Sequence, residues 1–312
     1  IHTPSKSRLA SSCIGKPMVP QEEHHLKLVS ESSRRCRRAF LFMTLTFSIN
    51  HATVTTPIIY ASSVLDYRIG NYSNAILYVT TMISSLFFAP LVNNQLGPKG
   101  GLLTGLTAYT IYVFLFALSV LYCKTSDGQR CTEGSSAQWI TALHGAFIGG
   151  LGAGLLWTSQ GAFFTAIVGR LTQARDALEA DEQTLLQEVT AELSATFAFW
   201  YLLIECLAKA MFTVLQEYVG LASSTVFFIW SAVAAVATIV FAFAESVQPV
   251  QASEKQSVCG KSLEALRLWT DPKIWLLSLT NLTFGFSVAW LNGYINSNFL
   301  REALDSTTFI GF

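Results

Sequence analysis

Residues 150–165 read GLGAGLLWTSQGAFFT and lie inside a long apolar run. Each glycine costs about 1 kcal/mol relative to alanine in a helix, so something must offset this composition. Gly145 with Gly149, and Gly150 with Gly154, form two GxxxG pairs. Small residues at that spacing let two helix backbones approach closely in lipid. Because these glycines occupy more than one helix face, the stretch predicts a membrane helix that packs on several sides inside a bundle.

The composition favours the same class of protein. Hydrophobic residues make up 51% of the chain and charged residues only 13%, whereas soluble domains carry about 25% charged residues. The formal net charge is zero, and no basic stripe alternates with aromatic residues, so no nucleic-acid partner is expected. The six cysteines form no CxxC or CxxH pair, and no HExxH or GxSxG motif occurs. We therefore expect no enzyme, no metal site and no cofactor.

Seven stretches have the length and composition of membrane-spanning helices, for which about 20 mostly apolar residues are needed. They are residues 39–62, 74–93, 102–123, 138–161, 194–216, 222–244 and 274–297. The chain then ends at STTFIGF, residues 306–312, which is typical of the beginning of an eighth span. The sequence thus predicts an all-α, multi-pass integral membrane protein whose helix bundle is truncated after about seven transmembrane helices.

The basic residues predict an orientation. The connections between spans place eleven lysines and arginines on the side of the N-terminus and four on the other, which predicts a cytosolic N-terminus. Residues 170–192 form either a solvated helix between two spans or a docking face for a cytosolic partner. Four regions are expected: a disordered cytosolic segment over 1–37, a first six-helix transmembrane half over 38–244, a cytosolic linker over 245–272, and the start of a second transmembrane half over 273–312.

The fourth predicted span resembles a signature of the UNC-93-like (uncoordinated-93-like) ion-channel regulator family, a branch of the major facilitator superfamily. Its Trp-Thr-Ala-Gln-Gly run is matched here by Trp157, Thr158, Gln160 and Gly161, with Ser159 in place of alanine. Residues 96–109, LGPKGGLLTGLTAY, resemble the family's Leu-Gly-Pro-Lys turn between the second and third spans. The resemblance covers residues 38–312 and implies a major-facilitator-like helix bundle.

The turn at Gly97 departs from the pattern of many transporters in this superfamily. Those proteins carry Gly-x-x-x-Asp-Arg-x-Gly-Arg-Arg here, and the charges latch neighbouring helices in one state. Only Gly97 and one cation remain in this chain, which weakens the case for ordinary alternating-access transport. Aligned on Gly97, the other positions hold Pro90, Asn94, Gln95, Pro98 and Lys99.

Ionisable residues inside the predicted spans are costly in lipid and are often functional. Glu205 and Lys209 lie one turn apart, with Tyr201 and Gln216 near the same face, and this order favours a helical ion pair. The pair is either self-neutralised toward the bundle interior, or it binds an ion or couples protons in a cavity. His144 is either a packing residue or a group that titrates near neutrality.

The first and seventh predicted spans are the most polar, and the resemblance makes them symmetry mates. Their polar residues line a central cavity or form hydrogen bonds between helices. At the end of the fourth span, Trp157 and Gln160 are expected to line the mouth of that cavity, with a lipid-facing anchor as the alternative for Trp157. The candidates in the first and seventh spans are Asn50, His51, Asn281 and Asn292.

The predicted outer side carries two candidate modifications. Asn71-Tyr72-Ser73 has the sequence of a glycosylation acceptor, which requires an accessible position. Cys123 and Cys131 lie in one predicted outer loop and form a disulfide if the compartment is oxidising.

Three functions remain open at this stage. The resemblance implies a non-enzymatic membrane protein that modulates or escorts another membrane protein, often an ion channel. The polar first and seventh spans favour a secondary transporter of a small solute or ion. The third function is that of a structural subunit in a larger membrane complex. The expected partners are the lipid bilayer and another membrane protein.

Overall fold

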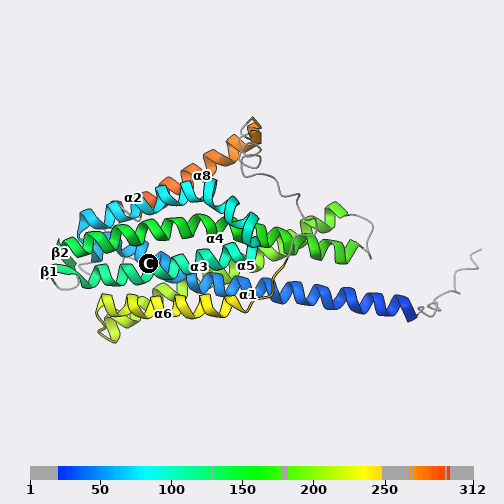
Figure 1. Cartoon of the computed structure of the whole chain (residues 1–312), viewed down its shortest axis with the longest axis horizontal. Coiled ribbons are helices and arrows are strands. Elements are labelled where there is room, and N and C mark those ends of the chain that lie inside the picture. Colours follow the sequence, from blue (N-terminus) through cyan, green and yellow to red (C-terminus); the bar gives the residue numbers. More distant parts are fainter. Residues whose placement is uncertain are drawn as a thin grey trace, which may run out of the picture.

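The computed structural model describes residues 20–127, 130–176, 182–247, 267–268, 270–291 and 294–295. Helices dominate these residues and extend along the long axis of the molecule (Figure 1). The elements are α1 (Pro20–Val64), α2 (Tyr67–Ile83), the π-helical turn η1 (Ser84–Phe88), α3 (Ala89–Leu121), β1 (Cys123–Asp127), β2 (Arg130–Gly134), α4 (Ser136–Asp176), α5 (Glu182–Thr213), the π-helical turn η2 (Val214–Tyr218), α6 (Ser223–Ala242) and α8 (Pro272–Trp290). The helical class is confirmed, with one β hairpin that the sequence did not predict.

Within the described residues, four helical segments are long and apolar enough to cross a membrane, which fits an integral membrane protein. They are Tyr67–Leu121, Ser136–Ala174, Gln183–Tyr218 and Ser223–Ala242. The first of these segments contains two predicted spans, which run in opposite directions because the chain reverses at Gly97 (Figure 1). The φ of Gly97 is 70°, which lies in the left-handed region that favours glycine. Among the described helices, α1 and α8 do not reach this apolarity, so the seven-span arrangement stays a prediction.

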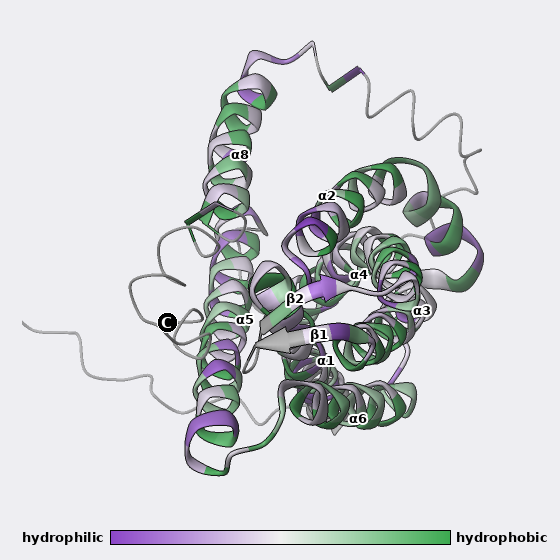
Figure 2. Cartoon of the chain, turned by 90° about the vertical axis from the view of Figure 1, so that its left-hand side faces the viewer, coloured by the Kyte–Doolittle hydropathy of each residue, from purple (hydrophilic) through white to green (hydrophobic). Residues whose placement is uncertain are grey.

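The polarity of α1 reflects its central position. This helix packs against α2, α3, α4, α5 and α6, and Thr44, Asn50 and Thr56 in its middle are fully buried. In the interior, Asn50 and Thr56 find partners on neighbouring helices. For example, Trp230 of α6 donates from Nε1 to Thr56 Oγ1 at 3.3 Å. Apolar residues cover most of the length of the surrounding helices (Figure 2).

The structure corrects the predicted N-terminal boundary. Helix α1 begins at Pro20, so the segment expected to be disordered up to residue 37 is helical from residue 20. Proline suits the first turn of a helix, and the Gln, Glu and Leu residues that follow are good helix formers. The sequence prediction gave too much weight to the polar composition and too little to helix propensity.

The connection at 170–192, expected to be a solvated helix between two spans or a docking face, is helical in its described parts. Helix α4 continues to Asp176 and α5 begins at Glu182, so most of this connection extends the two spans. Arg37 forms an ion pair with Glu192, and its second nitrogen donates to Oε2 at 3.0 Å, which ties the extension of α5 to α1. Most of the predicted linker over 245–272 lies outside the described residues.

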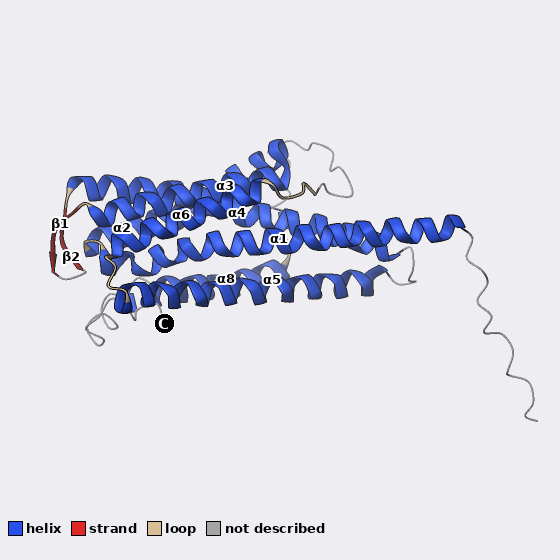
Figure 3. Cartoon of the chain, turned by 90° about the horizontal axis from the view of Figure 1, so that it is seen from below, coloured by secondary structure: helices blue, strands red, loops and turns tan. Residues whose placement is uncertain are grey.

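Helix α8 covers most of the seventh predicted span but has no buried residue. It stands at the edge of the molecule in Figure 2. The β hairpin lies at the end of the bundle opposite the N-terminal extension of α1 (Figure 3).

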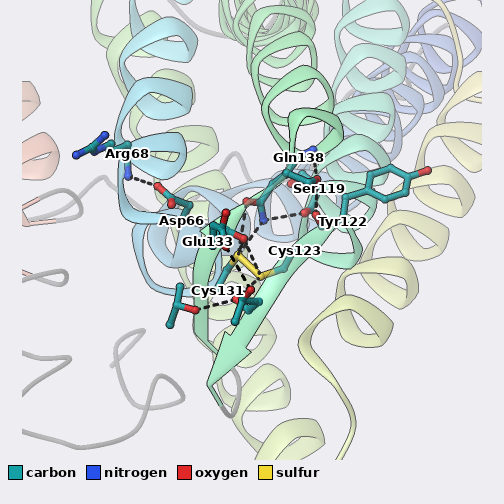
Figure 4. Close-up of a disulfide and its surroundings, with 11 residues drawn as sticks. Asp66, Arg68, Ser119, Tyr122, Cys123, Cys131, Glu133 and Gln138 are labelled. Atoms are coloured by element: carbon teal, nitrogen blue, oxygen red, sulfur yellow. Dashed lines mark hydrogen bonds between the residues drawn. A yellow bond between two sulfur atoms is a disulfide. The ribbon is translucent and has the colours of Figure 1, made fainter.

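A disulfide between Cys123 and Cys131 closes the hairpin, as predicted (Figure 4). The strands pair antiparallel. Buried Gln138, near the start of α4, donates from Nε2 to the carbonyl oxygen of Ser119 at 3.0 Å. The same Nε2 lies 3.6 Å from Cys131 Sγ of β2, so Gln138 contacts both the hairpin and the end of α3.

Candidate functional site

Four side chains from α1 and α5 form a polar cluster, which we define as His51, Tyr201, Glu205 and Lys209. Lys209 Nζ donates to Glu205 Oε1 at 2.6 Å. The Tyr201 hydroxyl lies 3.2 Å from His51 Nδ1, and the same nitrogen lies 3.7 Å from Glu205 Oε2. That carboxylate oxygen is buried and has no hydrogen-bond partner in the described residues. The predicted ion pair of Glu205 and Lys209 therefore forms, and His51 extends it to a second helix.

The polar cluster is well shielded from solvent. The exposed fractions of the side chains are 8% for His51, 13% for Glu205 and 18% for Lys209. Tyr201, Glu205 and Lys209 are spaced four residues apart, so they line one face of α5, and that face packs against α1. Charged groups in such an environment are retained only where they are paired or used.

Aromatic rings border the polar cluster on the side of α1 and α4. The Trp157 ring lies edge-on to both His51 and Phe47, with centroids 5.2 and 5.1 Å apart. Phe197 packs on the other side of Phe47 at 5.5 Å. Trp157 is 39% exposed, so one part of its ring covers the polar cluster and the rest is open. The Trp157 ring thus contacts the polar cluster and is also exposed in part, so the interior role and the lipid-facing anchor both stay predictions.

The glycines of α4 allow close packing of this helix against α2, η1 and α3. A Cβ on Gly149 would lie 2.7 Å from the Tyr112 ring of α3, and one on Gly150 would lie 2.5 Å from the Leu77 carbonyl oxygen of α2. A Cβ on Gly145 would lie 3.1 Å from Leu115 Cβ of α3, and one on Gly154 would lie 2.6 Å from Ser84 Cβ of η1. The predicted packing on more than one face is confirmed. It fixes the helix that carries Trp157.

Asn50 lies beside His51 in the sequence but points elsewhere. It is fully buried, and its Nδ2 lies 3.0 Å from Thr238 Oγ1 of α6 and 3.4 Å from the Leu106 carbonyl oxygen of α3. Of the two roles open from the sequence, the geometry gives Asn50 the hydrogen-bonding role between helices.

Other candidates also lie apart from the polar cluster. His144 is exposed, and its Nδ1 lies 2.8 Å from the Ile140 carbonyl oxygen in the same helix. Gln160 is half-buried and makes no hydrogen bond within the described part of the chain. Asn281 is exposed on α8. Asn292 lies outside the described residues. Asn281, the described candidate of the seventh predicted span, makes no hydrogen bond to Asn50 or His51.

The candidate glycosylation acceptor lies within a helix. Asn71 is half-buried in α2, and Ser73 of the same motif is only 1% exposed. Because glycan attachment needs an accessible acceptor, typically on a surface loop, the structure argues against modification of Asn71.

Sequence reasoning missed Phe47 and the contact between His51 and Glu205. The spacing of Phe47 and His51 by four residues places both on one face of α1, and this was the available signal. Among the residues that the structure describes, no group of three or more His, Cys, Asp or Glu side chains is placed to hold a metal ion. Comparisons with protein-family models, curated proteins and solved structures found no match.

Proposed function

We propose that this chain is a non-enzymatic multi-pass membrane protein of the UNC-93-like type, which modulates or escorts a partner membrane protein such as an ion channel. The turn at Gly97 carries this proposal. Lys99 Nζ donates to the carbonyl oxygen of Ala242, the last residue of α6, at 2.9 Å, and Ser159 Oγ donates to Asn93 Oδ1 at 2.8 Å. A lysine at a helix C-terminus is a stabilising cap. These contacts hold the turn without the charge latch of many transporters, which supports a regulator.

A second candidate function is secondary transport of a small solute or ion, and the polar cluster favours it. The buried Glu205 Oε2 has an unused acceptor position, while His51 and Lys209 add basic groups beside it. The Trp157 ring beside His51 is 39% exposed, and in this proposal a small ligand reaches the polar cluster past that ring.

The two functions are separable with the full-length protein. For the regulator, we expect the abundance or current of a partner membrane protein to change when the chain is depleted and to recover when the chain is restored. For the transporter, we expect uptake or current in proteoliposomes that is lost with Glu205→Gln and kept with His144→Gln, the matched control outside the polar cluster. A partner effect without transport supports the regulator. Transport without an effect on a partner overturns the regulator proposal. If neither transport nor an effect on a partner is found, the structural subunit is the remaining function.

A further inference from the structure

A cavity of about 400 Å³ lies at the end of the bundle that carries the extension of α1. One wall is a face of α1 with Glu31, Arg35 and Cys36, and the opposite side is formed by Arg170 of α4 and Glu245, which follows α6. Cys36 is only 7% exposed, whereas Glu31, Arg35, Arg170 and Glu245 are exposed at the rim. The cavity therefore combines a buried floor with two positive and two negative groups at its opening.

This cavity lies beside the end of the candidate membrane span of α6. The candidate span of α6 ends at Ala242, and Glu245 follows it by three residues. Arg170 lies four residues before the end of the longer candidate segment of α4, at Ala174. Phe243, which precedes Glu245 by two residues, is 83% exposed and offers an apolar surface at the same level. A ligand in this position has its polar part in the cavity and its apolar part in the membrane.

The charges at the rim select the ligand. Arginine binds phosphate through paired, charge-assisted hydrogen bonds, and carboxylates accept hydrogen bonds from a primary ammonium group. We propose that the cavity binds the zwitterionic headgroup of phosphatidylethanolamine, with its phosphate at Arg35 and Arg170 and its ammonium group at Glu31 and Glu245.

Other headgroups match this set of charges less well. The quaternary ammonium of phosphatidylcholine has no N–H group to donate to Glu31 or Glu245. An anionic headgroup without an ammonium group would be repelled by the same two carboxylates. Pockets that select anionic lipids are basic and have no such repelling groups. A cavity of about 400 Å³ corresponds to roughly a dozen water volumes, which is ample for one phosphoethanolamine group.

The test is native mass spectrometry of the full-length protein purified in detergent with phosphatidylethanolamine, phosphatidylcholine or phosphatidylglycerol added. We expect phosphatidylethanolamine to be retained about tenfold more than phosphatidylcholine, because one charge-assisted hydrogen bond is worth at least this factor. Arg35→Gln is expected to abolish the preference. Glu245→Gln is expected to shift it toward phosphatidylglycerol, since it removes one repelling carboxylate. Arg34→Gln is the matched control, because it removes the same charge one residue away, outside the cavity lining.

Several outcomes overturn the proposal. Equal retention of the three lipids means that the cavity has no headgroup specificity. An equal loss with Arg34→Gln and Arg35→Gln means that binding follows the total charge of α1. If the wild-type protein retains phosphatidylglycerol best, binding is due to a general basic surface and not to the proposed pairing of charges. If free glycerophosphoethanolamine displaces the lipid at equal concentration, the ligand of the cavity is a soluble zwitterion and not a membrane lipid.

Discussion

His51 of α1 and Glu205 of α5 approach to 3.7 Å, between Nδ1 and Oε2, although they are far apart in the sequence. The other oxygen of Glu205 accepts a hydrogen bond from Lys209. One buried carboxylate is therefore shared between two basic groups, one on each helix. This arrangement couples the packing of α1 and α5 to the charge state of the polar cluster.

Replacing Lys209 alone with alanine is expected to destabilise the protein more than replacing both Glu205 and Lys209 with apolar residues. Removal of one partner from a buried pair costs about 3–5 kcal/mol, whereas an apolar replacement of the whole pair is often neutral. Thermal unfolding of the purified variants measures the difference. Additive losses in the double variant would show that the two groups do not interact.

Gly150→Ala is expected to lower the yield of folded protein. The added Cβ would lie 2.5 Å from the Leu77 carbonyl oxygen, and the backbone at that point cannot move independently of α2. Gly161→Ala is the matched control in the same helix, because its Cβ meets nothing within 4 Å, and alanine gains about 1 kcal/mol in helix propensity. Size-exclusion profiles of both variants test this difference, and equal yields would contradict the packing role of Gly150.

Gln160→Leu is expected to leave the folded yield unchanged but to abolish transport or partner modulation. The side chain is half-buried and makes no hydrogen bond within the described residues, so its replacement by a leucine of similar size breaks no hydrogen bond there. Folded yield and the functional assay are measured on the same preparation. If the folded variant keeps full function, the Trp157–Gly161 stretch serves packing alone.

Cys131→Ser is expected to lower the free energy of unfolding by about 2–3 kcal/mol, the range for a short closed loop; the two cysteines are eight residues apart. Alkylation without reduction, followed by peptide mass spectrometry, detects the cross-linked peptides in the parent protein. Alkylated Cys123 and Cys131 in protein from an oxidising compartment would contradict the disulfide.

Cys36 is expected to react slowly with maleimide at neutral pH. Burial raises the pKa of the Cys36 thiol, and only the thiolate is reactive, so a raised pKa leaves less reactive thiolate near pH 7. The labelling rate of a variant that keeps only Cys36 should continue to rise at a pH where an exposed cysteine has levelled off. Arg34→Cys in a cysteine-free background supplies that exposed reference on the same helix, and identical pH profiles would contradict the prediction.

Local features were predictable from the sequence because they depend on helix geometry. The contact between Glu205 and Lys209 follows from a spacing of four residues, and the glycine faces of α4 follow from the GxxxG pairs. The Cys123–Cys131 pair lies within one short loop, so few conformations separate the two thiols.

Contacts between distant segments were not predictable in the same way. The approach of His51 to Glu205 depends on the rotation of α1 about its axis, and the sequence of α1 is polar on several faces. The same uncertainty concealed the direction of Asn50, which faces α3 and α6. The helical extension from Pro20 was missed because composition alone does not separate a polar helix from a disordered segment.

Helix α1 contains no proline or glycine between Arg35 and His51, and the structure shows it as one continuous helix over that interval. At 1.5 Å per residue, these two positions are about 24 Å apart along the axis. Such a segment behaves as a stiff rod, so a torque or tilt imposed at Arg35 reaches His51 without an intervening hinge. A tilt of α1 at its N-terminal end would therefore also change the 3.7 Å separation between His51 and Glu205.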